Sequence, residues 1–187
     1  MNEDLQYAVL HEFVEPARRN LSPGSWDYLM GGAETETTLE RNRRALDALA
    51  FRPRVLRNVE KVSARAKIFG QDVRLPVILA PIGSLQDFSP GGGMGPTRAA
   101  AKFGALHMLS SACAPGLEAV AECVDYPKIY QLYVRGDTAW VEDHVARAMA
   151  SKYVALCLTV DPDYYGRRER DLAKRYLTTS RRSNPAD

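Results

Sequence analysis

The chain has 187 residues, of which 45% are apolar and 26% charged, and 25 lysines and arginines against 23 aspartates and glutamates give a formal net charge of +2. This balance of charge argues against a nucleic-acid-binding protein that relies on bulk electrostatics, and the ordinary apolar content argues against intrinsic disorder. A closed (β/α)8 barrel needs about 250 residues, so the chain is too short to form one.

The cysteines and the amino terminus bear on the cellular compartment. Cys113, Cys123 and Cys157 are odd in number, widely spaced and without a CxxC pair, so neither a disulfide framework nor a zinc site is expected. The first four residues, which include Glu3 and Asp4, are not followed by the apolar run of a signal peptide, and no stretch approaches about 18 apolar residues. We therefore expect a cytoplasmic protein without a membrane span, in a reducing environment.

The first third of the chain is predicted to be helical. Residues 5–14 place apolar side chains at helical spacing. Ser22 is expected to cap a second helix that has Pro23 in its first turn and ends at Gly31-Gly32. Acidic residues near Glu36, followed by arginines, predict the start of a third helix.

Residues 51–75 are expected to form a lid or plug ahead of the main sheet. Residues 51–56 have the pattern of an irregular extended segment. Two short apolar runs, at 66–69 and 73–75, flank Gly70-Gln71-Asp72 and predict a small hairpin.

A regular alternation of strand and helix patterns follows. Short apolar runs predict buried strands, and the segments between them have helical spacing. The predicted strands are 76–80, 105–109, 129–134 and 153–160, and the predicted helices are 97–103, 116–123 and 138–150. This order indicates βαβ units with right-handed crossovers and a parallel sheet, while the polar, basic residues after 161 are expected to form a loop or a disordered end.

Two loop motifs have ordinary structural explanations. Gly91-Gly92-Gly93-Met94-Gly95 fits neither the dinucleotide fingerprint nor the Walker loop, so we interpret it as a flexible connection into a helix. Residues 166–171 are rich in arginine, which can grip a carboxylate or phosphate through paired hydrogen bonds. By composition alone, a solvated charged loop is the simpler interpretation of this second motif.

Polar residues at the carboxyl ends of the predicted strands are more informative, because ligands of parallel α/β folds bind there. Individually, Ser110 could cap a helix, Gln131 could satisfy buried backbone, and Thr159 could simply favour a strand. Together with Tyr133 and the segment Ala80–Gly83, they form a row of donors and acceptors suited to a flat polar heterocycle. None of the three histidines lies at such a strand end, and His107 is expected in the core or at an edge.

Several ordered motifs give the chain a family resemblance. They are Trp26-Asp27-Tyr28 with Gly32-Ala33-Glu34, residues 38–42, residues 51–56, Leu75–Pro81, Ser110-Ser111, Gln131–Val134, Leu158–Asp161 and Gly166–Asp171. In this order and spacing, from about residue 7 to 176, the chain resembles the amino-terminal half of the FMN-dependent α-hydroxy-acid oxidases and dehydrogenases, the group of glycolate oxidase, lactate oxidase and mandelate dehydrogenase.

The resemblance implies a fold and a domain organisation. The fold would be α/β, the amino-terminal half, about four βα units, of a TIM (β/α)8 barrel, with FMN at the carboxyl ends of the strands. A helical extension and lid would occupy residues 1–75, the half barrel residues 76–176, and a flexible basic tail residues 177–187. A homo-oligomer, and a second polypeptide carrying the carboxyl-terminal half, are possible partners, whereas nucleic acid and metal are not expected.

The resemblance also assigns roles to single residues. Tyr28 and Arg168 would bind the carboxylate of a small 2-hydroxy acid such as lactate or glycolate, and Tyr133 would act at its hydroxyl. The residues that would contact FMN are Ile82, Gly83, Ser110, Gln131 and Thr159. Hydrogen-bond donors are needed there because reduced flavin carries negative charge near N1 and C2=O.

The chain departs from the family pattern in three places. Residues 89–93 replace a His-Pro-Asp/Glu-Gly-Glu motif, Asp161-Pro162-Asp163 replaces Asp-Thr-Pro, and Ala112 stands where an aromatic residue is common. The family's flavin-contacting lysine, catalytic histidine, second substrate arginine and FMN-phosphate site belong to the carboxyl-terminal half. His11, His107 and His144 do not match the catalytic base.

The expected function is oxidation of a small 2-hydroxy acid to a 2-oxo acid with FMN, with the isolated chain inactive until a carboxyl-terminal half is supplied. The alternative is an inactive truncated or decayed fragment, or a binding module, of the same family. A third hypothesis keeps the flavin and changes the substrate class, as in the type-2 isopentenyl diphosphate isomerases. Tyr28 and Arg168 argue against it, because they suit a small carboxylate.

Overall fold

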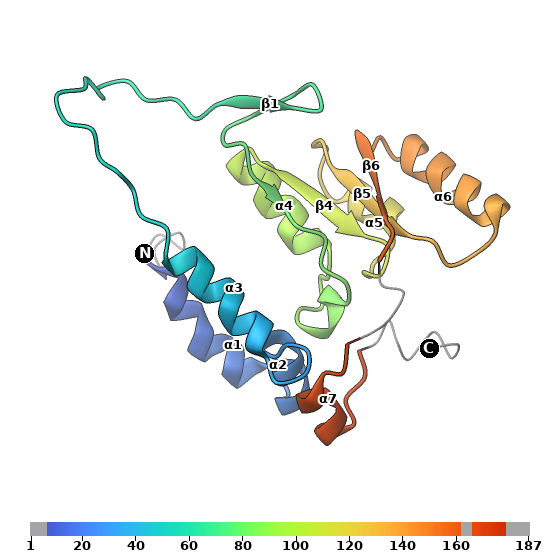
Figure 1. Ribbon diagram of the computed structural model, residues 1–187. Coiled ribbons are helices and arrows are strands. Elements are labelled where there is room, and N and C mark those ends of the chain that lie inside the picture. The colour runs from blue at the N-terminus through green and yellow to red at the C-terminus, as the bar shows by residue number, and fades with distance from the viewer. Residues whose placement is uncertain (1–6, 162–165, 179–187) are drawn as a thin grey trace. The chain divides into compact units, whose positions relative to one another are not determined.

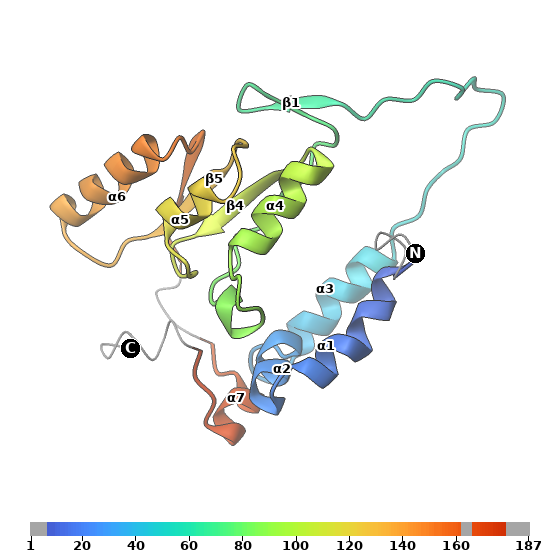
Figure 2. The same cartoon turned by 180° about the vertical axis from the view of Figure 1, so that it is seen from behind.

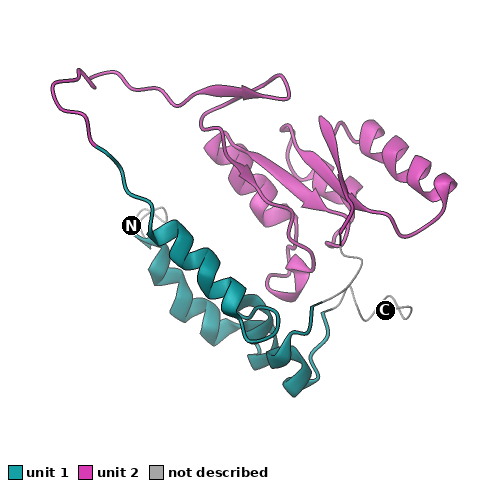
Figure 3. Cartoon of the chain, viewed as in Figure 1, with its two compact units in different colours: residues 1–52, 165–178 teal, residues 53–164, 179–187 magenta. Residues whose placement is uncertain are grey.

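A computed structural model describes residues 7–161 and 166–178. The chain divides into two compact units, residues 1–52 with 165–178 (unit 1) and residues 53–164 with 179–187 (unit 2), which Figure 3 colours separately. Across the described residues, no helix combines the length and the apolar content needed to cross a membrane.

Unit 1 is helical, as predicted for the first third of the chain. Its described residues form a 3₁₀ turn and four helices: η2 (Leu10–Phe13), α1 (Val14–Asn20), α2 (Pro23–Met30), α3 (Thr37–Asp47) and α7 (Glu169–Lys174), most of them labelled in Figure 1. The predicted cap of α2 is confirmed, because the Ser22 hydroxyl accepts the backbone N–H of Ser25 at 3.1 Å. Of the helix predicted over residues 5–14, residues 5 and 6 lie outside the described residues; from residue 7 onward, helical structure runs from Leu10 to Asn20, later than predicted.

Helix α7 corrects the prediction of a loop after residue 161. Glu169 and Asp171 lie in its first turn and Lys174 in its last, an arrangement that complements the helix dipole. Its cations also pair with acids of the amino-terminal helices, Arg170 with Glu36 at 2.6 Å and Lys174 with Asp27. These ion pairs stabilise a helix too short to stand alone. Most of the predicted tail at 177–187 lies outside the described residues.

A hairpin opens the regular structure of unit 2. Strands β1 (Ala66–Ile68) and β2 (Gln71–Val73) pair antiparallel, with Ala66 opposite Val73 and Ile68 opposite Gln71. Phe69 and Gly70 between them have φ values of 51° and 74°, the left-handed conformations of a two-residue type I′ turn. The hairpin is therefore confirmed, although its second strand starts two residues earlier than predicted.

The main sheet has the predicted parallel topology. Strands β3 (Ile78–Leu79), β4 (Leu106–Ser110), β5 (Ile129–Tyr133) and β6 (Ala155–Thr159) lie in the order β3-β4-β5-β6. The connections include η3 (Leu85–Asp87), α4 (Met94–Phe103), α5 (Leu117–Glu122) and α6 (Thr138–Ala150), which can be followed in Figure 1 and Figure 2. Four consecutive parallel strands with intervening helices form half of a TIM barrel.

The two faces of the sheet pack against different elements. On one face, Leu109, Tyr130 and Leu132 pack with α5 and α6 through a cluster that includes Val120 and Ala148. On the other face, Leu106 and Ile129 pack against Val73 of the hairpin. This second contact explains why residues 53–75 group with the sheet in unit 2, which differs from the predicted boundary at residue 75.

The loop before α4 is held by close backbone approach. Gly92 has φ +48°, and a Cβ placed on it would overlap the carbonyl oxygen of Ala114. Only glycine fits this position without rearrangement. The glycine cluster leads into α4, as predicted, but close packing of Gly92 against Ala114 replaces the flexible connection that was expected.

Candidate functional site

The predicted cofactor residues of the sheet lie in one row at the carboxyl ends of β4, β5 and β6. Ser110 is the register partner of Gln131, and Tyr133 is the partner of Thr159. Gln131 and Tyr133 are two residues apart in β5, so their side chains point to the same face, the one that carries Leu106 and Ile129 at its opposite end. This face is thus apolar at the amino ends of the strands and polar at their carboxyl ends.

Gln131 is the centre of this row. Its Nε2 donates to the Thr159 hydroxyl oxygen at 2.7 Å. Its Oε1 is buried and has no hydrogen-bond partner among the described residues. A buried, unpaired carbonyl oxygen costs about 1–3 kcal/mol, and a bound group with an N–H donor would recover that cost. This buried, unpaired oxygen distinguishes Gln131 from Ser110 and Thr159 in the same row.

The neighbouring serines fix the backbone of this rim. The Ser111 hydroxyl accepts the backbone N–H of Tyr133 at 3.0 Å, and the Ser111 N–H donates to the carbonyl oxygen of Gln131 at 2.8 Å. The Ser110 hydroxyl accepts the N–H of Ala112 at 3.2 Å, a local turn contact. Sequence reasoning missed the role of Ser111, which only its place directly after a strand could have suggested.

Ile82 and Gly83 follow β3 and lie beside the segment after β4. The N–H of Ser84 donates to the carbonyl oxygen of Ala112 at 2.9 Å, and a Cβ on Gly83 would lie 3.3 Å from that of Ala112. The side chain of Gln86 accepts the N–H of Ala114 at 3.0 Å. Gln86, which the sequence did not single out, therefore ties the two segments together.

The predicted carboxylate-binding pair comes together in unit 1. The guanidinium carbon of Arg168 lies 4.6 Å from the centre of the Tyr28 ring, a cation–π contact. Arg168 also donates to the carbonyl oxygens of Tyr28 and, at 3.1 Å, Gly31, at the carboxyl end of α2. Tyr28 and Arg168 are separated by 140 positions in the sequence, so no local pattern predicts this proximity.

The histidine inside the sheet is not at the polar rim. His107 is buried, and its Nδ1 lies 2.8 Å from the hydroxyl of Thr97, which itself donates to the carbonyl oxygen of Gly93 at 2.7 Å. Since the threonine proton is used at Gly93, the hydrogen between the two side chains belongs to the histidine. Burial lowers the pKa of His107 to about 4, so the ring is neutral at pH 7.

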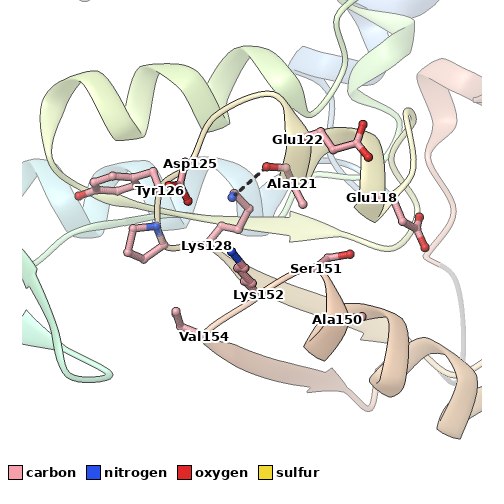
Figure 4. A pocket seen from close by; sticks show the side chains of 11 residues that line it. Glu118, Ala121, Glu122, Asp125, Tyr126, Lys128, Ala150, Ser151, Lys152 and Val154 are labelled. Carbon is pink, nitrogen blue, oxygen red and sulfur yellow. Dashed lines mark hydrogen bonds between the residues drawn. The ribbon is translucent and has the colours of Figure 1, made fainter.

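A cavity of about 510 Å³ lies in unit 2 at the amino ends of β5 and β6 (Figure 4). Within it, Lys128 donates to the carbonyl oxygens of Ala121 at 3.4 Å and Val124 at 3.1 Å, at the carboxyl end of α5. Burial lowers the pKa of Lys128. None of the predicted site residues lines this cavity, so it is separate from the polar rim.

Comparison with known proteins identifies the family. The sequence model described as FMN-dependent dehydrogenase matches residues 17–186. The chain belongs to the FMN-dependent dehydrogenase family. Among curated relatives, it is 36% identical over 166 residues to glycolate oxidase 1 of Zea mays, covering 89% of this chain and 45% of the relative. It is 37% identical over 160 residues to the L-lactate dehydrogenase of Pseudomonas aeruginosa, covering 86% and 42%.

Solved structures of FMN-dependent dehydrogenase relatives support the half-barrel fold. An oxidized active mutant of (S)-mandelate dehydrogenase aligns with a TM-score of 0.85 and 30% identity, covering 95% of this chain and 51% of that one. Mandelate oxidase aligns with a TM-score of 0.86 and 32% identity, covering 92% and 50%. The chain thus spans about half the length of the relatives it matches, as expected for the amino-terminal half.

The rim residues fit the family's cofactor. The pyrimidine part of a flavin has one ring N–H between two carbonyls, a pattern that a neighbouring amide and hydroxyl groups can match. In kind, the unpaired Oε1 of Gln131 matches such an N–H as an acceptor, and Thr159 and Ser110 carry hydroxyls in the same row. The polar groups that match the flavin all belong to side chains of this chain.

Proposed function

We propose that this chain forms the amino-terminal half of an FMN-dependent enzyme that oxidises a small 2-hydroxy acid to a 2-oxo acid. The observation that carries the proposal is the row of Ser110, Gln131 and Thr159 at the strand ends, with the unpaired, buried Oε1 of Gln131 at its centre. Ordinary core packing does not explain an acceptor left in this state.

Ser110, Gln131 and Thr159 hold the polar edge of the flavin, and the backbone of Ile82 and Gly83 approaches its ring. Bound FMN supplies the chemistry of the reaction by accepting the two electrons and the hydrogen removed from the hydroxy acid. The position of Ile82 and Gly83 directly after β3, beside the segment that follows β4, supports the second contact.

Tyr28 and Arg168 bind the substrate carboxylate, and Tyr133 contacts the substrate hydroxyl. The proximity of the Tyr28 ring and the Arg168 guanidinium supports the first assignment. The position of Tyr133 on the same sheet face as Gln131, at the carboxyl end of β5, supports the second. None of the described histidines lies at the carboxyl end of a sheet strand, and we assign the proton acceptor to the other half of the barrel.

The remaining half is supplied by further polypeptide, either a second chain or the continuation of a longer one. The edge of β6 supports this part of the proposal, because β6 pairs only with β5 among the described strands. Its apolar side chains Leu156 and Leu158 are 44% and 53% exposed, and Val160 beyond it is 89% exposed. The free backbone edge of β6 is suited to pairing with a further strand, and these exposed side chains lie on the sheet face that α5 and α6 cover at β4 and β5.

The test is reconstitution. We expect the purified chain alone to show no visible flavin absorbance and no oxidation of lactate, glycolate or mandelate. Adding the other half of the barrel, encoded downstream or taken from the Pseudomonas lactate dehydrogenase, should restore both. A Gln131→Leu chain serves as the matched control and should recover less flavin.

Two outcomes would contradict the proposal. Stoichiometric FMN and turnover from the chain alone would show that no further half is needed. Failure of every complement to restore flavin binding would favour the alternative, an inactive fragment of the family.

A further inference from the structure

The hydrogen bonds of Arg168 leave only part of its guanidinium available. Its Nε donates to Asp171 Oδ2 at 2.6 Å, and its Nη2 donates to the carbonyl oxygens of Tyr28 and Gly31. A guanidinium carries five N–H groups, one on Nε and two on each Nη. Three are therefore used within unit 1, and the two that have no partner among the described residues are both on Nη1.

Asp171 has the features of a group that holds another side chain in place. It lies in the first turn of α7, three residues after Arg168, and its side chain is 11% exposed. Its Oδ2 accepts from Arg168, while its Oδ1 is buried and has no partner among the described residues. Burying a carboxylate in this way costs free energy that its single ion pair must offset. A charged residue at this position therefore calls for a role beyond packing.

We propose that Asp171 is the positioning residue for Arg168, and that it turns the guanidinium so that Nη1 alone meets the carboxylate of the substrate. The Asp171 carboxylate fixes the Nε edge, and the two carbonyl oxygens at the end of α2 fix Nη2. The usual bidentate contact between arginine and a carboxylate needs N–H groups on two different nitrogens. Because Nε and Nη2 are already engaged, this contact is blocked. This inference rests on the proposed function, in which Arg168 binds the substrate.

The first experiment uses the chain by itself. In ¹⁵N-arginine-labelled protein, the Nε–H of Arg168 should exchange slowly with water, and Asp171→Ala should speed this exchange about tenfold through loss of a charge-assisted hydrogen bond. Glu36→Gln, which breaks the neighbouring pair with Arg170, is the matched control and should leave it unchanged. Equal exchange in wild type and Asp171→Ala would overturn the positioning role, whatever the outcome of reconstitution.

The second experiment uses the reconstituted enzyme and the affinity for a 2-oxo acid product, followed by the flavin spectrum. Asp171→Ala should weaken binding about tenfold, and should have no further effect when Arg168 is already glutamine, because contacting residues are energetically coupled. Additive losses, or no loss from Asp171→Ala, would overturn the inference while flavin binding persists. Absence of flavin binding in every variant would instead contradict the proposed function.

Discussion

In unit 2, the polar row of Ser110, Gln131 and Thr159 follows from strand register, whereas in unit 1 Arg168 reaches Tyr28 and Gly31 across 140 and 137 residues of sequence. The first arrangement needs only parallel strands that end together. The second needs a short helix, α7, to pack on α2 through ion pairs. The position of the polar row is thus determined by backbone pairing within the sheet, whereas the position of Arg168 is determined by side-chain contacts within unit 1.

The largest effect is expected from Gly92→Ala in unit 2. The new Cβ would overlap the carbonyl oxygen of Ala114 in a left-handed backbone, and we expect a loss of about 4 kcal/mol in the free energy of unfolding. Urea unfolding followed by Trp140 fluorescence, in a Trp26→Phe background, measures unit 2. Gly91→Ala, where no atom lies within 4 Å of the added Cβ, is the control, and equal midpoints would contradict this account.

A somewhat smaller effect is expected from pH, again in unit 2. The folded pKa of His107 is about 4 against an ordinary value of 6.5, so the unfolded chain binds more protons between these values. The stabilisation is therefore fully present above pH 6.5 and is lost as the pH falls toward 4, by about 3 kcal/mol at most. Urea midpoints across this range should flatten in His107→Gln, and an unchanged slope would show that another group is responsible.

Arg168→Gln should act on unit 1. It leaves the Asp171 carboxylate without its cation and two carbonyl oxygens of α2 without their donor, so we expect a loss of about 2 kcal/mol. Trp26 fluorescence in a Trp140→Phe background reports this unit. If the loss in the free energy of unfolding is as large when followed by Trp140 as by Trp26, the two units unfold together. The units then differ in local geometry but not in stability.

The smallest effect on stability is expected from Gln131→Leu. The lost hydrogen bond to Thr159 is offset by removal of the unpaired Oε1, so the free energy of unfolding should change by less than about 1 kcal/mol. The affinity of the reconstituted protein for FMN should nevertheless fall about tenfold. A large loss of stability with unchanged flavin affinity would make Gln131 a structural residue.

Local sequence patterns were sufficient to predict much of the fold. The apolar runs predicted the ends of β4, β5 and β6 to within two residues, because strand and helix periodicity is a property of neighbouring residues. Helix α7 could not be predicted in this way, since its six residues lack an apolar face and depend on Glu36 and Asp27 far along the chain.

The candidate site shows the same division. That Ser110, Gln131 and Thr159 lie in one row could be predicted from their places at strand ends. The unpaired Oε1 of Gln131 and the limited donors of Arg168 could not, because both depend on which atoms approach in three dimensions. The contacts of Ser111 and Gln86 were missed because they serve backbone groups, which no residue pattern records.

The open edge of β6 also has a consequence for colloidal behaviour. With a net charge of only +2, copies of the 187-residue chain repel one another weakly. The apolar side chains of Leu156, Leu158 and Val160 then give such copies a surface on which to meet. When these 187 residues are produced alone, we therefore expect their self-association to increase with protein concentration. Low protein concentration, with added arginine or other co-solutes, should keep them dispersed.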